Sequence, residues 1–510
     1  MKLSRRNPFF ILGLVLIWRL ALLIFTAQPI PANDAFIFDG GMANWLKNGQ
    51  YVNPCLEVGY PISSGQVFSI YPPVYQLALL VWMSLFGASA LSMMAMHLAM
   101  FAVGAWLCLL ILKSFFPGET NYAWAVCLLF GVTFNDRPED LAHVFGLGSL
   151  WLVTRQIAGT RHDARVAGAI VLALLFALYT SVIVGAVYFG AGFLASTGAW
   201  WFQRKKILLL PFFVVAGVFI LIVYWVIQVH PLWWQGFLEN GKKQQVMGGF
   251  HMPQGLDVSK LIRTVPVFLV AVAALPFVWS RRRQLVAEPW LFVAGGSFIM
   301  GLGTLFLAMT FVSPNYVGYT LYLEIILAAG LLVLGDRLFL ATKYLPRLLV
   351  LGCVLLVSVR AAGMTTWGAV CTWKNSYWHT RTELRAELKP FETSSAPVVI
   401  SSAYLYSALE FGVKHPIHSD WYYDRGLSGQ DLDFQGMVRL RPPKLVLTQF
   451  DYYRGFIDIL NKLRQHPELV TVQVRDKTAV RTPDSMPTMQ RVVQHISWAP
   501  VIVDLDWKNP

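Results

Sequence analysis

The stretch PFFILGLVLIWRLALLIFTAQPIPANDAFIFDG, residues 8–40, decides the fold class, because two carboxylates follow directly on a long apolar run. A helix needs about 20 apolar residues to cross a bilayer, and the run near residues 8–27 has that length. No small-residue cleavage site ends the run, so we expect a retained first transmembrane helix and no cleaved signal peptide. Asp34 and Asp39 would then lie at the membrane surface.

The composition of the chain supports the same class. Of its 510 residues, 56% are hydrophobic and 14% are charged, and the mean hydropathy is +0.53. A soluble globular protein is far less apolar, so these values predict many membrane spans. The formal net charge of +13 would suggest a nucleic-acid partner in a soluble chain, but in a membrane protein it indicates basic cytoplasmic loops. We therefore expect membrane lipids, and no nucleic acid, as partners.

Apolar runs along the chain predict about eleven transmembrane helices of about 20 residues each. The runs lie near residues 8–27, 90–112, 120–134, 140–155, 166–198 (long enough for two short helices), 207–229, 261–280, 289–312, 316–335 and 345–366. Residues 71–86 form a shorter run. As a helix rising ~1.5 Å per residue, this run would span only ~24 Å, less than the ~30 Å hydrocarbon core. We therefore expect it to lie along the interface.

The basic residues between the spans set the expected orientation. If residues 71–86 do not cross, every basic cluster falls on one side, which the positive-inside rule identifies as the cytoplasm. The clusters are Lys2, Arg5 and Arg6; Arg155, Arg161 and Arg165; Arg204, Lys205 and Lys206; Arg281, Arg282 and Arg283; and Arg337, Lys343 and Arg347. The N-terminus is then cytoplasmic. The outer side receives the loops 28–89, 135–140 and 230–260 and the C-terminal segment from about residue 367.

The charged residues of the three outer loops all lie close to helix ends, so they could converge on one site at the membrane surface. They are Asp34 and Asp39 in the first loop, Asp136, Arg137, Glu139 and Asp140 in the second, and Lys242, Lys243 and His251 in the third. Simpler interpretations compete with a site. Asp34 is a good N-cap for a short amphipathic helix, the acids of the second loop suit a helix dipole, and the lysine pair could belong to an ordinary solvated loop.

Three ordered motifs lie between residues 34 and 155. Asp34-Ala35 is followed by Ala43, Leu46 and Gly49; YPPVYQLALLVWMSLFGAS occupies residues 71–89; and NDRPEDLAHVFGLGSLWLVTR occupies residues 135–155. Their order and sidedness resemble the GT-C superfamily of membrane glycosyltransferases, above all the protein O-mannosyltransferases and the lipid A aminoarabinose and galacturonic acid transferases. The chain departs from the family at Ala35, where a glutamate is common, and at Asp39, where a tyrosine is common. Which carboxylate is catalytic is therefore left open.

The resemblance implies an inverting glycosyltransferase, which moves a sugar from a polyprenyl-phosphate donor to an acceptor hydroxyl on the extracytoplasmic face. The acceptor would be a lipid, a glycan or a protein. A carboxylate within hydrogen-bond reach would take the hydroxyl proton, and positive charge or a metal ion would stabilise the departing phosphate. The implied catalytic residues are Asp34, as first choice for the general base, with Asp39, Asp136 and Asp140.

The same resemblance implies the substrate and metal contacts. Arg137, Lys242 or Lys243 would hold the lipid phosphate, and Glu139 and His251 are further candidates for substrate binding. The sequence fixes no cofactor, but oxygen ligands such as Asp34 and Asp136 could hold a divalent cation, Mg²⁺ or Mn²⁺. The resemblance also favours the bacterial inner membrane as the location.

A polar region follows the last apolar run. APVVIS (396–401), KLVLTQ (444–449) and LVTVQV (469–474) predict buried strands, and helical patterns lie near residues 404–411 and 453–465. The expected fold is thus a polytopic α-helical membrane protein with a GT-C-like transmembrane domain, 1–366, and a small extracytoplasmic α/β domain, 367–510. No nucleotide-binding glycine loop stands out in the C-terminal region, which agrees with a lipid-linked donor.

A transporter or flippase of a lipid-linked or envelope precursor is the alternative function. Such a protein should carry ionisable residues near the middle of the membrane and internal repeats of spans. Few charges lie inside the apolar runs, the exceptions being Arg19, Glu324 and Arg360. Arg19 lies deep enough in the first span to need a partner.

Overall fold

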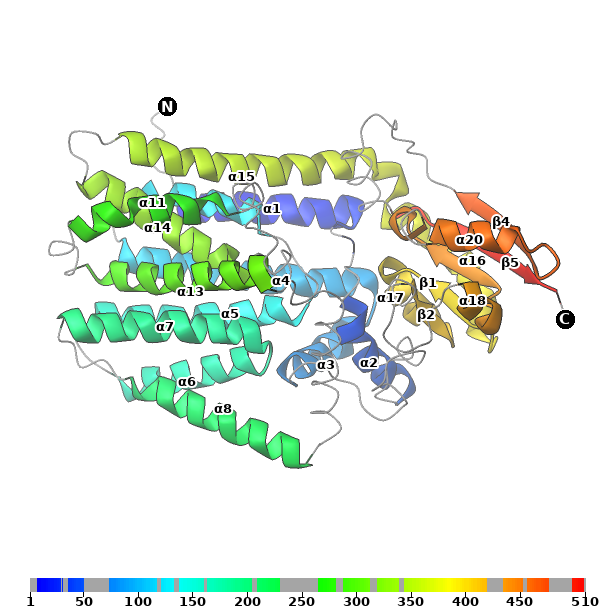
Figure 1. Cartoon of the computed structure of the whole chain (residues 1–510), viewed down its shortest axis with the longest axis horizontal. Coiled ribbons are helices and arrows are strands. Elements are labelled where there is room, and N and C mark those ends of the chain that lie inside the picture. The colour runs from blue at the N-terminus through cyan, green and yellow to red at the C-terminus, as the bar shows by residue number, and fades with distance from the viewer. Residues whose placement is uncertain are drawn as a thin grey trace.

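Long helices run side by side along the longest axis of the protein, and a small sheet lies at one end of them (Figure 1). The computed structural model describes residues 7–28, 30, 35–49, 73–116, 121–132, 137–159, 163–203, 209–229, 265–280, 288–311, 319–338, 344–419, 434–452, 456–476 and 498–508. The helical bundle consists of α1 (Pro8–Thr26), α2 (Ala35–Asn48), α3 (Val74–Phe86), α4 (Ala90–Phe115), η2 (Asn121–Phe130), α5 (Pro138–Ala158), α6 (Ala164–Leu178), α7 (Val182–Gln203), α8 (Leu210–Val229), α11 (Pro266–Ser280), α13 (Pro289–Phe311), α14 (Leu321–Leu338) and α15 (Tyr344–Cys371).

Six helices in the described part of the chain are long and apolar enough to cross a membrane. They are Pro8–Thr26, Ala90–Phe115, Val182–Phe202, Leu210–Val229, Pro289–Leu307 and Leu348–Cys371. The other apolar runs also contain helices: among the described residues, four are shorter, α5 has 21 residues but is less apolar, and η2 is of the tighter 3₁₀ type. The mostly helical membrane class predicted from composition is therefore confirmed. The total of eleven transmembrane helices stays a prediction.

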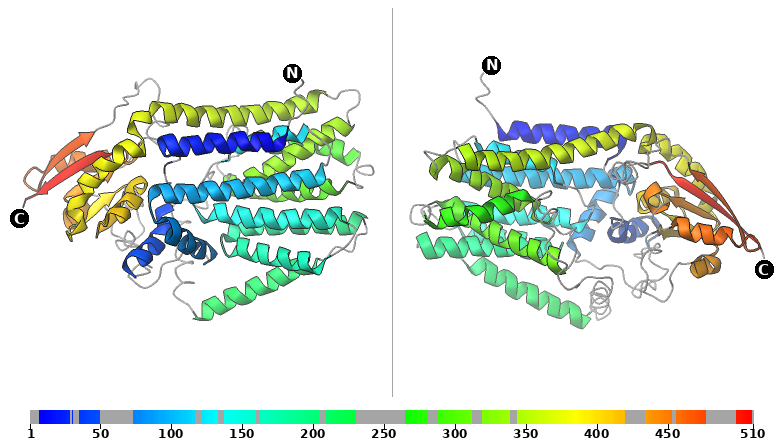
Figure 2. Two further views of the ribbon diagram at one scale, coloured as in Figure 1. Left: turned by 180° about the vertical axis from the view of Figure 1, so that it is seen from behind. Right: turned by 45° about the horizontal axis from the view of Figure 1, so that its top comes forward.

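α2 and α3, the two short helices of the predicted first outer loop, lie at the end of the bundle that faces the sheet (Figures 1 and 2). α3 buries Tyr75, Leu79 and Met83 against its neighbours and exposes the apolar side chains Leu77 and Val81. It is thus apolar on both faces, as expected of a helix that contacts protein on one side and lipid on the other. Its last turn ends at Gly87, which has a φ of 76° that few other residues adopt.

Small residues bring α7 and α13 close together. A Cβ atom added to Gly296 of α13 would lie 2.4 Å from the carbonyl oxygen of Ala191 in α7, and one added to Gly190 would lie 2.5 Å from the sulfur of Met300. Such close approaches at glycine are typical of helices packed in a membrane, where association depends on close van der Waals fit.

Two of the charged side chains inside the bundle pair with helix ends. The Arg19 guanidinium donates hydrogen bonds to the carbonyl oxygens of Phe130, at 3.2 Å, and of Val132, at the end of η2. The Glu324 carboxylate accepts a hydrogen bond of 3.2 Å from the backbone amide of Val267, in the first turn of α11. These are backbone groups that helix ends leave without a partner. Arg19 thus has the partner that its depth demands, while Arg360 is exposed.

The C-terminal region forms a five-stranded sheet with helices packed on it. Its elements are η5 (Trp373–Asn375), α16 (Tyr377–Leu388), η6 (Lys389–Glu392), β1 (Val398–Ile400), α17 (Ser402–Phe411), β2 (Pro416–His418), α18 (Phe434–Leu440), β3 (Lys444–Leu447), α19 (Gln449–Asp451), α20 (Ile457–Arg464), β4 (Val470–Asp476) and β5 (Val501–Trp507). The strand order is β2-β1-β3-β5-β4. β1 pairs in parallel with β2 and β3, and β5 pairs antiparallel with β3 and β4. The predicted strands coincide with β1, β3 and β4, whereas β2 and β5 were not predicted.

A buried carboxylate joins the ends of the parallel strands. Asp451 accepts hydrogen bonds from the hydroxyls of Ser401, which follows β1, and Ser419, which follows β2. The backbone amide of Asp451 in turn donates to Thr448, which follows β3, at 3.1 Å. All four side chains are buried. This cluster fixes the start of α17, because Ser401 directly precedes that helix.

Tryptophan side chains attach the C-terminal region to the first transmembrane helix. The indole of Trp498 donates to the carbonyl oxygen of Ala27 at 3.0 Å, and that of Trp378 donates to Ile24 at 2.7 Å. Trp498 is fully buried and packs against the Tyr377 ring, with a centroid distance of 5.0 Å. The sheet is thus tied to the end of α1 at which the first outer loop begins.

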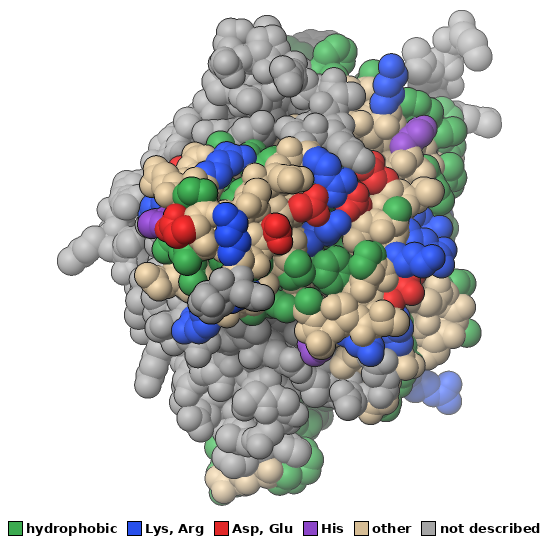
Figure 3. Space-filling model, turned by 90° about the vertical axis from the view of Figure 1, so that its right-hand side faces the viewer, with side chains coloured by type: hydrophobic (Ala, Val, Ile, Leu, Met, Phe, Trp, Pro, Cys, Tyr) green, Lys and Arg blue, Asp and Glu red, His purple; other side chains and the backbone are tan. Residues whose placement is uncertain are grey.

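The outer face of the C-terminal region mixes basic and acidic side chains (Figure 3). Among them, Arg475 contacts Glu387 at 2.7 Å and Asp504 at 2.7 Å, and Lys444 pairs with the same two acids. The hydrogen bond from Arg475 lowers the pKa of Glu387 to about 2, against the opposing effect of burial and with further help from Lys444. The network joins α16 to β3, β4 and β5.

This network predicts a pH-dependent stability. The folded pKa of Glu387, about 2, lies below its ordinary value of 4.5, so its stabilisation is fully present above pH 4.5 and is lost as the pH falls towards 2. We expect Glu387→Gln to reduce the free energy of unfolding by about 1–2 kcal/mol at pH 7, with the difference from wild type closing between pH 4.5 and 2. Thermal unfolding of the purified protein measures it. The control is Asp506→Asn, at an exposed position on β5; a gap for Glu387→Gln that persists at pH 2 contradicts the prediction.

Candidate active site

Four of the predicted site residues lie in the described part of the chain, and all four are at the end of the bundle near the sheet. Asp39 lies on α2, and Glu139 and Asp140 lie in the first turn of α5, with Arg137 directly before that helix. Asp34, Asp136, Lys242, Lys243 and His251 lie outside the described residues. The geometry of the site can therefore be built from the first group alone.

The carboxylate of Asp39 is fully buried and accepts hydrogen bonds from two tyrosines. One donor is the hydroxyl of Tyr406 on α17, and the other is that of Tyr75 on α3. Burial, followed by the nearby Asp39 charge, raises the pKa of Tyr75 well above its ordinary value, so this phenol keeps its proton and remains a donor. Asp39 thereby joins an element of the C-terminal region to both helices of the first outer loop.

His97 of α4 continues these contacts to the second outer loop. Its Nδ1 atom lies 2.7 Å from Oδ2 of Asp140, and its Nε2 atom lies 3.4 Å from the Tyr75 hydroxyl. His97 is buried, whereas the side chain of Asp140 keeps 12% of its surface exposed. A continuous series of polar contacts, Tyr406–Asp39–Tyr75–His97–Asp140, is here named the Asp39–Asp140 network.

A second group of contacts lies beside this network. The Nε atom of Arg137 is 3.3 Å from Oε2 of Glu139, and the hydroxyl of Tyr319 donates to Oε1 of Glu139 at 3.0 Å. The Arg137 guanidinium also lies 5.5 Å from the centroid of the Phe38 ring, next to Asp39 on α2. Glu139 is fully buried. The acids of α5 thus occupy the helix-dipole positions predicted for them and also contact neighbouring elements.

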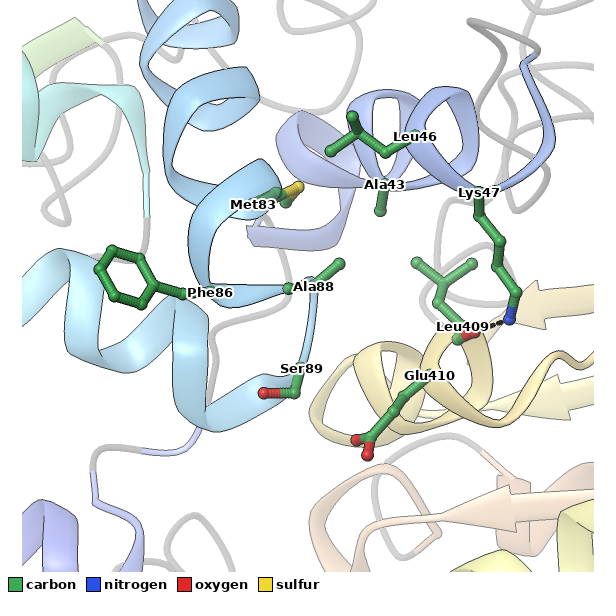
Figure 4. Close-up of a pocket in the computed structure, with 10 residues that line it drawn as sticks. Ala43, Leu46, Lys47, Met83, Phe86, Ala88, Ser89, Leu409 and Glu410 are labelled. Atoms are coloured by element: carbon green, nitrogen blue, oxygen red, sulfur yellow. Dashed lines mark hydrogen bonds between the residues drawn. The ribbon is translucent and has the colours of Figure 1, made fainter.

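A pocket of about 480 Å³ lies one helical turn beyond Asp39 along α2. It is lined by Ala43, Leu46, Lys47, Met83, Phe86, Gly87, Ala88, Ser89, Leu409 and Glu410. In Figure 4 the side chain of Lys47 reaches from α2 to α17, where it donates a hydrogen bond to the carbonyl oxygen of Leu409. Burial lowers the pKa of Lys47, while Glu392 and Glu410 oppose the shift. The pocket is therefore largely apolar with one cation and one acid at its edge.

The described residues do not by themselves form a metal site, since no three of their His, Cys, Asp and Glu side chains come together. His97 and Asp140 are a pair, with Tyr75 as their next polar neighbour. The two predicted metal ligands, Asp34 and Asp136, lie outside the described residues, so a metal site would depend on them.

Three members of the Asp39–Asp140 network, His97, Tyr75 and Tyr406, were not predicted as site residues from the sequence. His97 lies in an apolar run, where a polar residue is itself a sign of function or of a polar contact, so a signal was present. Tyr75 belongs to the motif of residues 71–89, but no role was predicted for it there. Tyr406 lies in the C-terminal region and carries no local signal that it contacts α2.

Comparison with solved structures identifies the fold. ArnT from Cupriavidus metallidurans bound to undecaprenyl phosphate shares 14% identity and a TM-score of 0.53, with 97% of each chain covered. The apo state of ArnT gives 13% identity, the same TM-score and the same coverage. AglB from Archaeoglobus fulgidus, an archaeal oligosaccharyltransferase in complex with an inhibitory peptide and a dolichol-phosphate, gives 10% identity and a TM-score of 0.48 over 86% of this chain and 69% of that chain.

No family profile matches the sequence, and no curated protein matches it either. At 14% identity the similarity to ArnT shows the fold alone, and it does so over nearly the whole length of both chains. ArnT is a GT-C protein. The GT-C fold predicted from the three sequence motifs is therefore confirmed.

The contact between Tyr406 and Asp39 predicts that Tyr406 contributes more to stability than Tyr404, the other tyrosine of α17. Tyr406→Phe removes a donor to a buried carboxylate and should reduce the free energy of unfolding by about 2 kcal/mol, because hydrogen bonds to charged groups contribute about 1.5–3 kcal/mol. Tyr404→Phe, the matched control, removes a hydrogen bond to the neutral carbonyl of Trp498 and should cost about 1 kcal/mol. Thermal unfolding of the purified variants compares them, and an equal or smaller loss for Tyr406→Phe contradicts the assigned contact.

Proposed function

We propose, from the fold shared with a GT-C protein, that this chain is an inverting glycosyltransferase with a polyprenyl-phosphate sugar as donor. The sugar, a hexose or a pentose, would be moved to a hydroxyl of a lipid, glycan or protein on the extracytoplasmic face. The similarity to ArnT, a protein solved with undecaprenyl phosphate bound, supports this donor class. The observation that carries the proposal is the Asp39–Asp140 network, because it connects acids of two outer loops at the bundle end.

The position of these acids suits such a donor. A polyprenyl phosphate keeps its chain in the bilayer and its phosphate at the surface, so the reacting carbon lies near the ends of the helices. Direct attack by the acceptor hydroxyl needs a base within hydrogen-bond reach, and it inverts the anomeric centre. Phosphate is already a good leaving group, so the remaining demand is for positive charge near its oxygens.

We assign the roles of the described acids by their exposure and those of Asp34 and Asp136 by the family resemblance. Asp34 directly precedes α2 and remains the first choice for the base. Asp140, the partly exposed member of the Asp39–Asp140 network, would orient the acceptor, alone or with Asp136. The full burial of Asp39 and Glu139 favours positioning roles for both: Asp39 would hold α2 against α3 and α17, and Glu139 would hold Arg137.

The positively charged candidates would meet the phosphate. Arg137 is one, and its contact with the Phe38 ring directs it towards α2. Lys242 and Lys243 are the others, with His251 as a further substrate contact. Phe86, an exposed apolar side chain of α3, lines the pocket of α2, α3 and α17, so an amphiphilic substrate could enter there from the bilayer. A divalent cation would supply further positive charge if Asp34 and Asp136 held one.

The orientation proposed for the chain follows from its basic clusters. The N-terminus would be cytoplasmic, about eleven helices would cross the bacterial inner membrane, and residues 367–510 would form a periplasmic domain. The arrangement of α2, α3 and the sheet at one end of the bundle (Figure 1) supports a common side for the first outer loop and the C-terminal region.

The proposal predicts the loss of one sugar from the cell envelope. We expect a strain that lacks the gene to lose a sugar from its envelope glycans or glycolipids, as measured by mass spectrometry, and wild type to restore it. Asp34→Asn should restore less than about 1% of the wild-type product, since general base catalysis contributes about 10²–10⁴-fold. Membrane insertion is checked for each variant.

Exposed acids of the C-terminal region provide the matched control. Asp506→Asn, on β5, should restore the product fully. Identical glycans with and without the gene would contradict the glycosyltransferase, and full restoration by a well-inserted Asp34→Asn would contradict its role as the base. Asp136→Asn and Asp140→Asn, made in the same strain, test the proposed acceptor contacts.

The transporter alternative predicts a different sensitive residue. Glu324→Gln keeps an oxygen acceptor for the Val267 amide but removes the charge, so a capping role predicts product within about twofold of wild type, the usual outcome for a substitution that keeps its contact. Ion-coupled transport would need the ionisable carboxylate. The same mass spectrometry measures the effect. Silent aspartate variants together with a defective Glu324→Gln would favour transport.

A further inference from the structure

His97 is a buried histidine between the Asp140 carboxylate and the Tyr75 hydroxyl. It lies on α4, two turns from the start of the helix at Ala90, and 1% of its surface is exposed. Its two ring nitrogens contact different partners, Asp140 at 2.7 Å and the Tyr75 hydroxyl at 3.4 Å. The second buried histidine of this region, His143, has its Nδ1 atom 3.0 Å from the hydroxyl of Tyr188.

The proton on His97 can be placed from the chemistry of its partners. An ionised carboxylate only accepts hydrogen bonds, so the short contact with Asp140 requires a proton on Nδ1. A carboxylate held by a histidine donor has fewer rotamers than one in solvent, and hydrogen bonds to charged groups are the stronger ones. Asp140 is also partly exposed, whereas His97 is buried.

We propose that His97 is a positioning residue, which orients the Asp140 carboxylate towards the acceptor by donation from Nδ1 and packs its other ring edge against Tyr75, a donor to Asp39. The inference rests on the proposed glycosyltransferase function. It assigns no contact between His97 and substrate, because the imidazole is buried. The two acids would then be held at a fixed separation by side chains of α2, α3, α4 and α5, and not by loops alone.

Asparagine and glutamine separate this role from a merely structural one. The side-chain amide of asparagine can place an N–H near the position of Nδ1, whereas that of glutamine reaches the position of Nε2. Glutamine is closer to histidine in size, so a packing role would favour His97→Gln. A donor role towards Asp140 favours His97→Asn.

The test is the amount of product per inserted protein in the gene-deletion strain. We expect His97→Asn to remain within about tenfold of wild type and His97→Gln to lose about 100-fold, the cost of misplacing a catalytic group by about 1 Å. A double variant of His97→Gln with Asp140→Asn should make about as much product as Asp140→Asn alone, because residues that act through one another are not additive. Ser92→Ala, a buried hydroxyl on the same helix that contacts Trp82, is the control and should match wild type.

The possible outcomes distinguish this inference from the proposed function. Glycans that are unchanged without the gene would overturn the proposed function and the role of Asp140 with it. A product that disappears without the gene but is restored by His97→Gln as well as by His97→Asn would overturn the inference on His97 alone. The same follows if the double variant falls far below Asp140→Asn, because His97 would then act independently of that acid.

Discussion

The buried carboxylate of Asp39 is the constraint on which this end of the molecule depends. A charge removed from water is costly unless hydrogen-bond donors replace the solvent. Here the donors are phenols from α3 and α17, Tyr75 and Tyr406, so the position of α2 is coupled to both. The first outer loop and the C-terminal region therefore cannot be arranged independently: displacing either one would leave Asp39 short of a donor.

The position of α17 depends in turn on the sheet. Asp451 gathers the hydroxyls that follow the parallel strands, including Ser401 directly before α17, and Trp498 ties the same region to the end of α1. Tyr406 lies on α17 and faces the bundle through its bond to Asp39. The C-terminal region is thus more than an appended domain, because its internal hydrogen bonds set the place of a residue in the candidate site.

Local sequence patterns predict most of the fold, because apolar length and periodicity belong to one element at a time. The break in the run 166–198 falls between α6 and α7, and three of the five strands lie where their patterns predict. β2 has only three residues and too little pattern to detect, while the alternating VIVDLDW of β5 was overlooked. The contacts of the site could not be predicted in this way. Tyr406 and Asp39 are 367 residues apart in the sequence, and only the assembled fold brings them together.

The contacts of the ionisable side chains favour a reaction at the end of the bundle over transport through its middle. The side chains of Arg19 and Glu324 contact backbone groups at helix ends, so both are accounted for by structural contacts. The acids near the sheet instead contact side chains from several elements, and Asp140 keeps part of its surface exposed. A lipid-linked phosphate is confined to the membrane surface by its own apolar chain. In the proposed function a carboxylate that orients the acceptor must be held there, and of the predicted site acids that the structure describes, Asp140 combines a contact to a neighbouring helix with a partly exposed surface.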